Sequence, residues 1–336
     1  MNPLISVVIA TRNRPALFAE ALDSVLAQGR DDVEIVVVDD GSSAESLSAY
    51  QPIWDAAAQR LGERWSLHRL VERPRGHGPS YALNTGAAHA RGSHLCFLDD
   101  DDRWTDSGHL DRVARAIGDA AAQGRVLDLY MGNQEAWIGD RSLGLLWLGA
   151  LAADLEARGR RPDEQGRYEV TVADLLRIDG FCHLNVFTVR RELYERVGGM
   201  DEGIRWEQDR KLYLDLIEPA RLMLHHPAVV SRHHVPDPSQ RNNVTTATAG
   251  IDKRLYQTLV MDRVLARSAD PAIRRHARLH KGYALKKIAV DYAAAGDWPN
   301  ASHYAGQALG AAPGLKWLLY TARCKWRTWR TWSQTH

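Results

Sequence analysis

Residues 5–42 read ISVVIATRNRPALFAEALDSVLAQGRDDVEIVVVDDGS. Residues 5–10 and 34–38 are short, almost entirely apolar runs rich in β-branched side chains, typical of strands buried on both faces of a parallel sheet. Between them, apolar residues recur at helical intervals at Leu17, Ala21, Leu22, Val25 and Leu26. This stretch therefore predicts a strand, a helix and a second strand.

The same alternation continues downstream. The patterns predict helices over about residues 44–61 and 79–90, and strands over 66–70 and 94–98. Parallel strands joined by right-handed crossovers place a ligand crevice at their carboxyl ends. We therefore expect an α/β fold with a doubly wound, mostly parallel sheet.

The end of the chain is different, because from about residue 250 the sequence is helical and amphipathic. Residues 281–314 are similar to one tetratricopeptide-type helical hairpin, although a plain helical pair explains them equally well. We expect one domain over 1–245, with halves 1–103 and 104–245, and a C-terminal α-helical extension over 246–336.

Composition narrows the class of protein. The 336 residues include 43 Lys and Arg against 42 Asp and Glu, so no overall charge favours nucleic acid as a partner.

The cysteines Cys96, Cys182 and Cys324 are odd in number and lack metal-ligand spacing, which argues against disulfides and a zinc site. No stretch reaches the roughly 18 to 20 apolar residues of a membrane span. A cytoplasmic protein is expected.

Polar motifs follow three of the predicted strands: residues 11–14, 39–42 and 99–102. Because the carboxyl ends of parallel strands meet at one edge of a sheet, these motifs should converge. Carboxylates at Asp39 and Asp40 can accept hydrogen bonds from a uracil imide or from ribose hydroxyls. A turn closed by an aspartate side chain, with Gly41 at positive φ, is the structural alternative, and both can hold together.

Residues 99–102 are four consecutive aspartates. Like charges this close repel unless a cation neutralises them, and carboxylate oxygens suit Mg²⁺ and Mn²⁺. In an extended chain Asp99 and Asp101 point to the same side, which favours them over Asp100 as the ligand-facing pair. The alternative is a solvated acidic turn that caps a helix beginning near Trp104.

Four segments together resemble the family-2 glycosyltransferases, which have the Rossmann-like glycosyltransferase-A fold. They are ISVVIATRNRP (5–15), VEIVVVDDGSS (33–43), GPSYALNTGAAHARGSHLCFLDDDDRW (78–104) and VGGMDEGIRWEQDRKLYLDL (197–216). The resemblance extends over about residues 3–240. It implies a nucleotide-sugar-binding half followed by an acceptor half. It also implies metal-dependent transfer of a sugar, with inversion, from a nucleotide diphosphate donor, and a UDP-sugar is favoured. The acceptor would be a glycan, a glycolipid or a protein in bacterial surface polysaccharide or glycoconjugate synthesis.

The resemblance also assigns residues of the donor site. The nucleotide-binding candidates are Thr11, Arg14, Asp39, Asp40, Asp99 and Asp100. Asp101 becomes the principal ligand of Mn²⁺ or Mg²⁺, assisted by Asp99. A late histidine follows the apolar strand predicted over 225–230, and the family pattern favours His234 over His233.

The catalytic base implied by the resemblance is Asp209, which would take the proton of the acceptor hydroxyl. The usual glutamate position holds Gln208, so Glu207, one residue earlier, is the reserve candidate. Alternatively, these acidic residues only complement the dipole of the helix that they begin.

Further substrate contacts are expected from His183 and Asn185 on the acceptor side, and from Arg241 as a clamp on the diphosphate. Trp104 and Trp206 flank the acidic motifs, where they either stack on a sugar or pack in the core.

Residues 315–332 interleave tryptophan with lysine and arginine. This pattern suits peripheral contact with a membrane interface, which would place a lipid-linked acceptor at the inner face of the membrane. A helix packed on the preceding hairpin is the alternative.

Two other functions are alternatives to glycosyl transfer for the front half of the sequence. A sugar-1-phosphate nucleotidyltransferase needs a glycine-rich loop after the first strand, and residues 10–15, ATRNRP, contain no glycine. A non-catalytic nucleotide-binding module with a partner-binding helical tail is the other.

Overall fold

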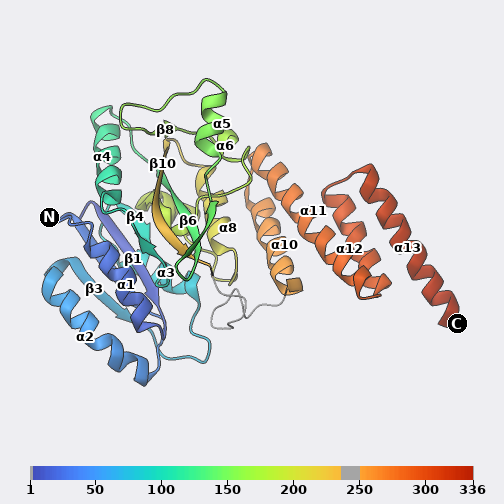
Figure 1. Ribbon diagram of the computed structural model, residues 1–336, viewed down its shortest axis with the longest axis horizontal. Helices are drawn as coiled ribbons and strands as arrows, with labels where there is room; N and C mark the ends of the chain where they lie inside the picture. The colour runs from blue at the N-terminus through green and yellow to red at the C-terminus, as the bar shows by residue number, and fades with distance from the viewer. Residues whose placement is uncertain (1–2, 236–249, 336) are drawn as a thin grey trace. The chain divides into compact units, whose positions relative to one another are not determined.

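The computed structural model describes residues 3–235 and 250–335 (Figure 1). The chain divides into two compact units, Met1–Asp237 and Pro238–His336. The domain boundary predicted at residue 245 lies outside the described residues.

The first unit contains a sheet with ten strands in the described residues, and its main path runs β3-β2-β1-β4-β9-β6-β10-β5. The first four of these are parallel to one another: β1 (Ile5–Thr11), β2 (Val33–Asp39), β3 (Trp65–Arg69) and β4 (His94–Phe97). They are connected through α1 (Pro15–Leu26), α2 (Ala44–Leu61), the short 3-10 helix η1 (Gly62–Arg64) and α3 (Pro79–His89). This half confirms the predicted α/β alternation.

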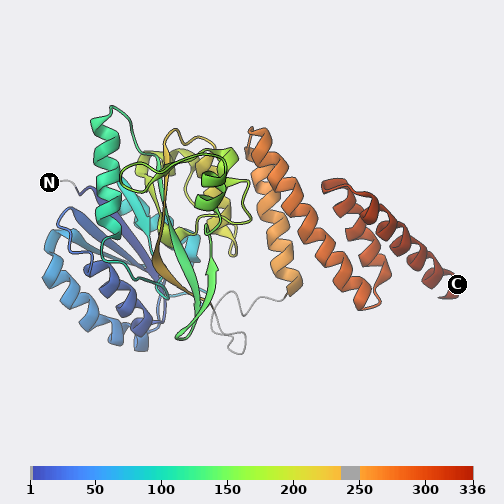
Figure 2. The same cartoon turned by 45° about the horizontal axis from the view of Figure 1, so that its top comes forward.

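The second half of the sheet is mixed, with antiparallel strands beside parallel ones, and belongs to the same predicted α/β fold. Its strands are β5 (Arg103–Trp104), β6 (Leu129–Ile138), β7 (Arg141–Leu146), β8 (Tyr168–Glu169), β9 (Phe187–Arg190) and β10 (Met223–His234). Strand β9 enters between β4 and β6 and is antiparallel to both, whereas β10 is parallel to β6. The β6–β7 hairpin projects beyond the rest of the sheet (Figure 2).

Helices cover the sheet and make the core. The helices of the second half are α4 (His109–Ala122), α5 (Leu151–Ala157), α6 (Val172–Leu175), η2 (Leu184–Val186), α7 (Arg191–Val197) and α8 (Gln208–Ile217). An apolar cluster joins β1 and β2 to α1, α2 and α4. On α3, Gly86 permits a close approach to the sheet, because a Cβ there would lie 2.4 Å from Val8 Cγ1.

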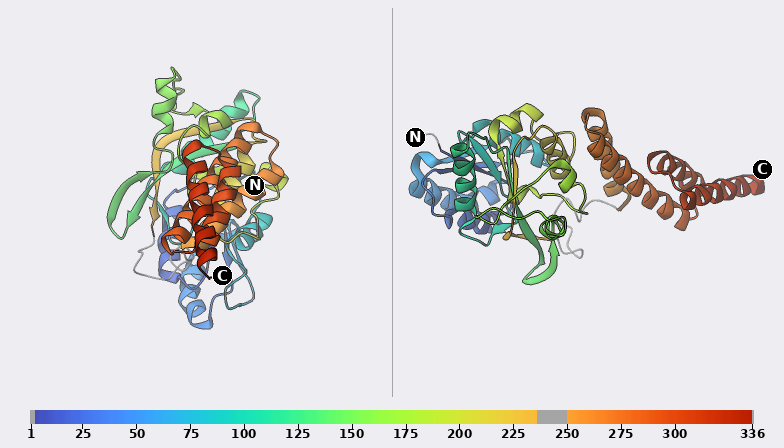
Figure 3. Two further views of the ribbon diagram at one scale, coloured as in Figure 1. Left: turned by 90° about the vertical axis from the view of Figure 1, so that its right-hand side faces the viewer. Right: turned by 90° about the horizontal axis from the view of Figure 1, so that it is seen from above.

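The second unit is helical, with α10 (Gly250–Arg267), α11 (Pro271–Ala294), α12 (Trp298–Ala311) and α13 (Leu315–Thr335). Each helix packs on the next one along the chain (Figure 3). Asp270 caps α11 by accepting from the backbone N–H of Ala272 at 2.7 Å. Among the described residues, no helix has the length and apolarity required to cross a membrane.

Candidate active site

The ends of β1, β2 and β4 meet at one edge of the sheet, where they bring the three polar motifs together. Thr11 pairs with Asp39 in the β1–β2 register and donates its hydroxyl to Asp100 Oδ2 at 2.6 Å. The Arg14 guanidinium contacts Asp100 at 2.5 Å and Asp101 at 2.6 Å. Arg14, predicted as a nucleotide ligand, is therefore engaged by the acidic turn in this structure.

Asp39 closes a tight turn at the end of β2. Its Oδ1 accepts from the Ser42 N–H at 3.2 Å, and Gly41 has φ +73°. An added Cβ at Gly41 would lie 2.6 Å from the Val71 carbonyl oxygen. The turn proposed as the structural alternative is thus present.

Asp40 fixes the loop that precedes α3. Its Oδ1 accepts from the His77 N–H at 2.7 Å and its Oδ2 accepts from the Gly78 N–H at 3.0 Å. Gly76 has φ +62°, and a Cβ there would lie 2.3 Å from Asp40 Oδ2. Asp40 therefore holds this loop beside the end of β2.

Asn185 joins the acidic turn to the second half of the sheet. Its Oδ1 accepts from the Asp99 N–H at 2.8 Å, and its Nδ2 donates to Asp102. Asn185 was predicted as an acceptor contact, but it is buried and holds the shape of the turn.

Asp102 contacts residues from the second half of the sheet. Besides Asn185, it contacts His233 Nδ1 at 2.7 Å and accepts from the His234 N–H at 2.5 Å. Asp102, His183 and His233 offer ligand atoms within 4.8 Å of one another, the one such group found in the described residues. Sequence reasoning did not select Asp102, although it noted the run of four aspartates.

His233 and His234 contact Asp102 in different ways because both lie in β10, which extends to His234 instead of ending near residue 230. Adjacent residues of a strand face opposite sides of the sheet, so the two rings point apart. The ring of His233 contacts Asp102, whereas His234 reaches that carboxylate through its backbone. His234 lines a shallow hollow together with Asp101 and Arg232.

Two other aromatic groups surround the His233 ring. The ring centroids of His183 and Trp147 lie 4.8 Å and 4.9 Å from that of His233. His183 also contacts Asp209, the predicted base: its Nε2 lies 3.5 Å from Asp209 Oδ2. Trp147 carried no sequence signal, since it belongs to a segment without a recognisable motif.

The pKa values of the acidic turn reflect crowding of charge. Burial raises the pKa of Asp99 well above its ordinary value, and the charges of Asp102 and Asp101 raise it further. Burial raises the pKa of Asp100 to about 7, although the Arg14 cation acts in the opposite direction. In the described part of the chain, no hydrogen bond or ion pair engages the Asp99 carboxylate.

The pKa values of His183 and His233 shift in opposite directions. Burial lowers the pKa of His183 to about 3, and the nearby His233 contributes to that decrease. Burial alone would lower the pKa of His233 too, but the Asp102 carboxylate raises it to about 9. Burial opposes ionisation of Asp102, yet the His233 charge brings the pKa of Asp102 below its ordinary value.

Asp209 and Glu207 lie at the start of α8. Burial raises the pKa of Asp209, whose Oδ1 accepts from the Arg210 N–H at 2.8 Å. Glu207 precedes the helix with φ +57°, a left-handed conformation that is unusual for a side chain other than glycine, and its Oε2 lies 3.6 Å from Arg210 Nε. Asp209 thus contacts the histidine cluster through His183, whereas the ion pair found for Glu207 is with Arg210.

The remaining predicted residues have different positions. Trp104 is 4% exposed and donates its indole N–H to the Asn185 carbonyl at 2.8 Å, so it packs in the core and does not stack on a sugar. Trp206 is partly exposed in the segment before α8. Arg241 lies outside the described residues.

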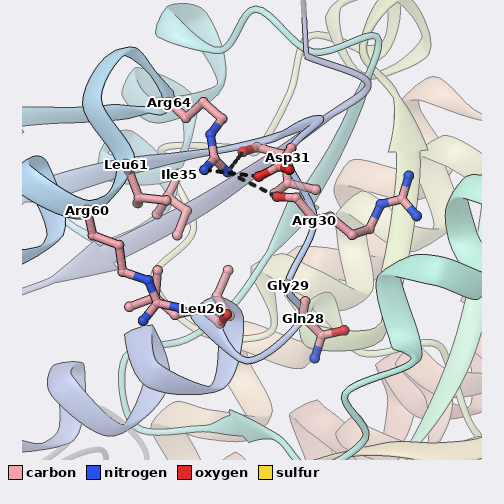
Figure 4. A pocket seen from close by; sticks show the side chains of 11 residues that line it. Leu26, Gln28, Gly29, Arg30, Asp31, Ile35, Arg60, Leu61 and Arg64 are labelled. Atoms are coloured by element: carbon pink, nitrogen blue, oxygen red, sulfur yellow. Dashed lines mark hydrogen bonds and ion pairs between the residues drawn. The ribbon is translucent and has the colours of Figure 1, made fainter.

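Figure 4 shows a second pocket, at the opposite end of β2 from Asp39. Its Arg64 donates to the Arg30 carbonyl at 3.0 Å and lies 3.4 Å from Asp31. Since this arginine holds the loop that precedes β2, we do not assign the pocket to the active site.

A family model described as glycosyl transferase family 2 matches residues 6–196, more than half of the chain. The chain therefore belongs to the family-2 glycosyltransferases.

Proteins named PGL/p-HBAD biosynthesis glycosyltransferase, from Mycobacterium bovis and Mycobacterium tuberculosis, are 35% identical to it over 152 residues. The match covers 45% of this chain and 53% of theirs, so the chain spans about half the length of these curated relatives.

Solved structures confirm the fold. The structure of S. aureus TarS 1–349 in complex with UDP-GlcNAc matches with a TM-score of 0.64 and 16% identity, covering 92% of this chain and 81% of that one. The mannosyltransferase PcManGT from Pyrobaculum calidifontis, in complex with GDP-Man and Mn²⁺, matches with a TM-score of 0.56 and 21% identity, covering 98% and 86%. At these identities the likeness concerns the α/β fold.

Proposed function

We propose that this protein transfers a sugar, with inversion, from a nucleotide diphosphate to a hydroxyl of a glycan or lipid-linked acceptor, and that it uses a divalent cation. The observation that supports this most is the short chain of contacts from the acidic turn through His183 to Asp209. In this proposal Asp209 accepts the proton, and the acidic turn with its histidines holds the cation and the donor diphosphate. Known structures of the same fold contain UDP-GlcNAc, or GDP-Man with Mn²⁺.

The residues of the turn fit a cation. The Asp99 carboxylate has a strongly raised pKa because of burial and its acidic neighbours, and a cation would relieve that crowding. Nδ1 of His233 contacts Asp102. This contact orients the other ring nitrogen of His233, as in many histidines that bind metals. Asp99, Asp101 and His233 would therefore hold Mn²⁺ or Mg²⁺. When bound, the ion supplies positive charge for the leaving diphosphate.

Asp209 is the proposed catalytic base. Its raised pKa, caused by burial, brings a carboxylate closer to the range in which it can accept a proton from an alcohol as the bond to the sugar forms. A second carboxylate acting as nucleophile is not required, because direct displacement by the acceptor oxygen inverts the anomeric centre.

The donor side is formed by Thr11, Asp39 and Asp40 at the ends of β1 and β2. A uridine diphosphate is favoured, with its base beside the Asp39 turn and the loop held by Asp40.

The cation is tested by thermal shift of the full chain with UDP or GDP, each with Mn²⁺ or with a chelator. The matched variants are His233→Ala and His234→Ala. We expect the Mn²⁺-dependent part of the shift to vanish in H233A and to persist in H234A. A nucleotide shift that does not depend on Mn²⁺ in the unmodified protein would refute the metal assignment.

The base is tested by hydrolysis of the nucleotide-sugar donor, with water as acceptor. Asp209→Asn should retain the nucleotide shift and lower the rate by about a hundred- to ten-thousand-fold, whereas Glu207→Gln should change it only a few-fold. An unchanged rate in D209N together with a large loss in E207Q would reverse the assignment.

A further inference from the structure

Helix α13 has an apolar stripe on the side that its packing leaves exposed. The exposed fractions are 75% for Leu315, 50% for Leu318, 65% for Leu319, 48% for Trp326 and 62% for Trp329. These positions, with Ala322 between them, recur at steps of three and four and so form one face of the helix. Large apolar side chains in such a continuous row are a signature of an interaction surface.

The opposite face of α13 is already occupied. Trp317 donates its indole N–H to the Ala305 carbonyl at 3.0 Å, Thr328 donates to the Trp298 carbonyl at 2.8 Å, and Cys324 is completely buried. The exposed stripe is therefore held outward by the packing of α13 on α12.

Cations flank the stripe on both sides. At 100° per residue, Arg323 and Arg330 lie along one margin and Lys325 along the other. The Arg330 guanidinium carbon lies 4.9 Å from the Trp326 ring. After Asp297 the sequence contains five Lys and Arg but no Asp or Glu.

We propose that this stripe binds the surface of an anionic lipid bilayer, with the helix lying in the interface plane. Indoles prefer the headgroup level and the flanking cations complement anionic lipid, whereas the stripe supplies the apolar area that inserts. A hollow lined by Pro299, Lys325 and Trp329 adds further apolar surface beside it. Two copies of α13 joined through this face would instead bring cations together without an acid on either helix.

The test is flotation of the full chain with vesicles of phosphatidylcholine mixed with phosphatidylglycerol, against vesicles of phosphatidylcholine alone. We expect binding to the anionic vesicles, weakened by salt, with a blue shift of tryptophan emission. Replacing Arg323, Lys325 and Arg330 by glutamine should weaken binding roughly a hundredfold. Trp326→Ala with Trp329→Ala should weaken it on the order of thirtyfold.

The matched control is Leu279→Ala with Tyr283→Ala, which removes exposed apolar side chains from α11 and should leave binding unchanged. Nucleotide binding by all variants, measured by thermal shift, shows that they are folded. Equal binding to neutral vesicles, equal loss in the α11 control, or a stripe variant that changes only the oligomeric state would overturn the proposal. Retention of an RNA oligonucleotide in preference to vesicles would also overturn it.

Discussion

The carboxylate of Asp40 anchors the loop before α3, and this can be tested by Asp40→Asn. The carboxylate accepts two backbone N–H groups, from His77 at 2.7 Å and from Gly78 at 3.0 Å. Asparagine keeps one acceptor oxygen, so its NH₂ group must face the other backbone donor. At least one hydrogen bond to a charged group is lost, which costs about 1.5–3 kcal/mol of local stability.

Amide hydrogen exchange measures this loss directly. If the loop opens locally, the amides of His77 and Gly78 should exchange on the order of 10- to 150-fold faster in D40N, because each 1.36 kcal/mol is a factor of ten. Trypsin should also cleave sooner after the exposed Arg75.

Asp39→Asn is the matched control, since Asp39 accepts from the Ser42 N–H and not from the loop. It should leave exchange at residues 77 and 78 as in the unmodified protein. The reasoning fails if D40N leaves these two amides as protected as before, or if D39N exposes them equally.

Three further outcomes follow from the packing. Burial lowers the pKa of His109 from 6.5 to about 3, so the unfolded chain binds the extra proton as the pH falls below 6.5. Stability should therefore drop by about 2 kcal/mol between pH 7 and pH 5 from this residue, and urea unfolding of His109→Leu should show a correspondingly smaller drop. Gly86→Ala should cost about 1–3 kcal/mol, because the new Cβ would lie 2.4 Å from Val8 Cγ1, and adding Val8→Ala should recover part of that loss. The buried thiols Cys96 and Cys182, whose pKa burial raises, should not react with a thiol reagent until urea unfolds the chain; rapid labelling of the native protein would contradict their burial.

The parallel half of the fold could be predicted because local pattern and burial agree there. The helix predicted over 44–61 is α2, and the helix predicted over 79–90 ends one residue earlier in α3. Strand β10 was predicted too short, because Arg232, His233 and His234 are polar. Their backbone groups pair with β6, which extends a strand whatever the side chains are.

The site could be predicted in part. The aspartate motifs and Asp209 lie at the start of helices or the ends of strands, where sequence alone locates them. Which histidine ring meets Asp102 depends on the register irregularities of β10 between His225 and Ser231, and these arise from pairing with β6. The packing of Trp147 on His233 is likewise tertiary, so no local pattern announces it.

The position of β9 has a consequence for protein engineering. Asn185, two residues before β9, binds both the Asp99 N–H and the Asp102 carboxylate, so the donor motif is completed by a residue encoded more than eighty positions later. A chimera joined after residue 103 would pair the aspartates of one parent with the asparagine segment of another. Exchange of specificity between relatives should therefore transplant residues 183–190 along with the front half, as one unit of recombination.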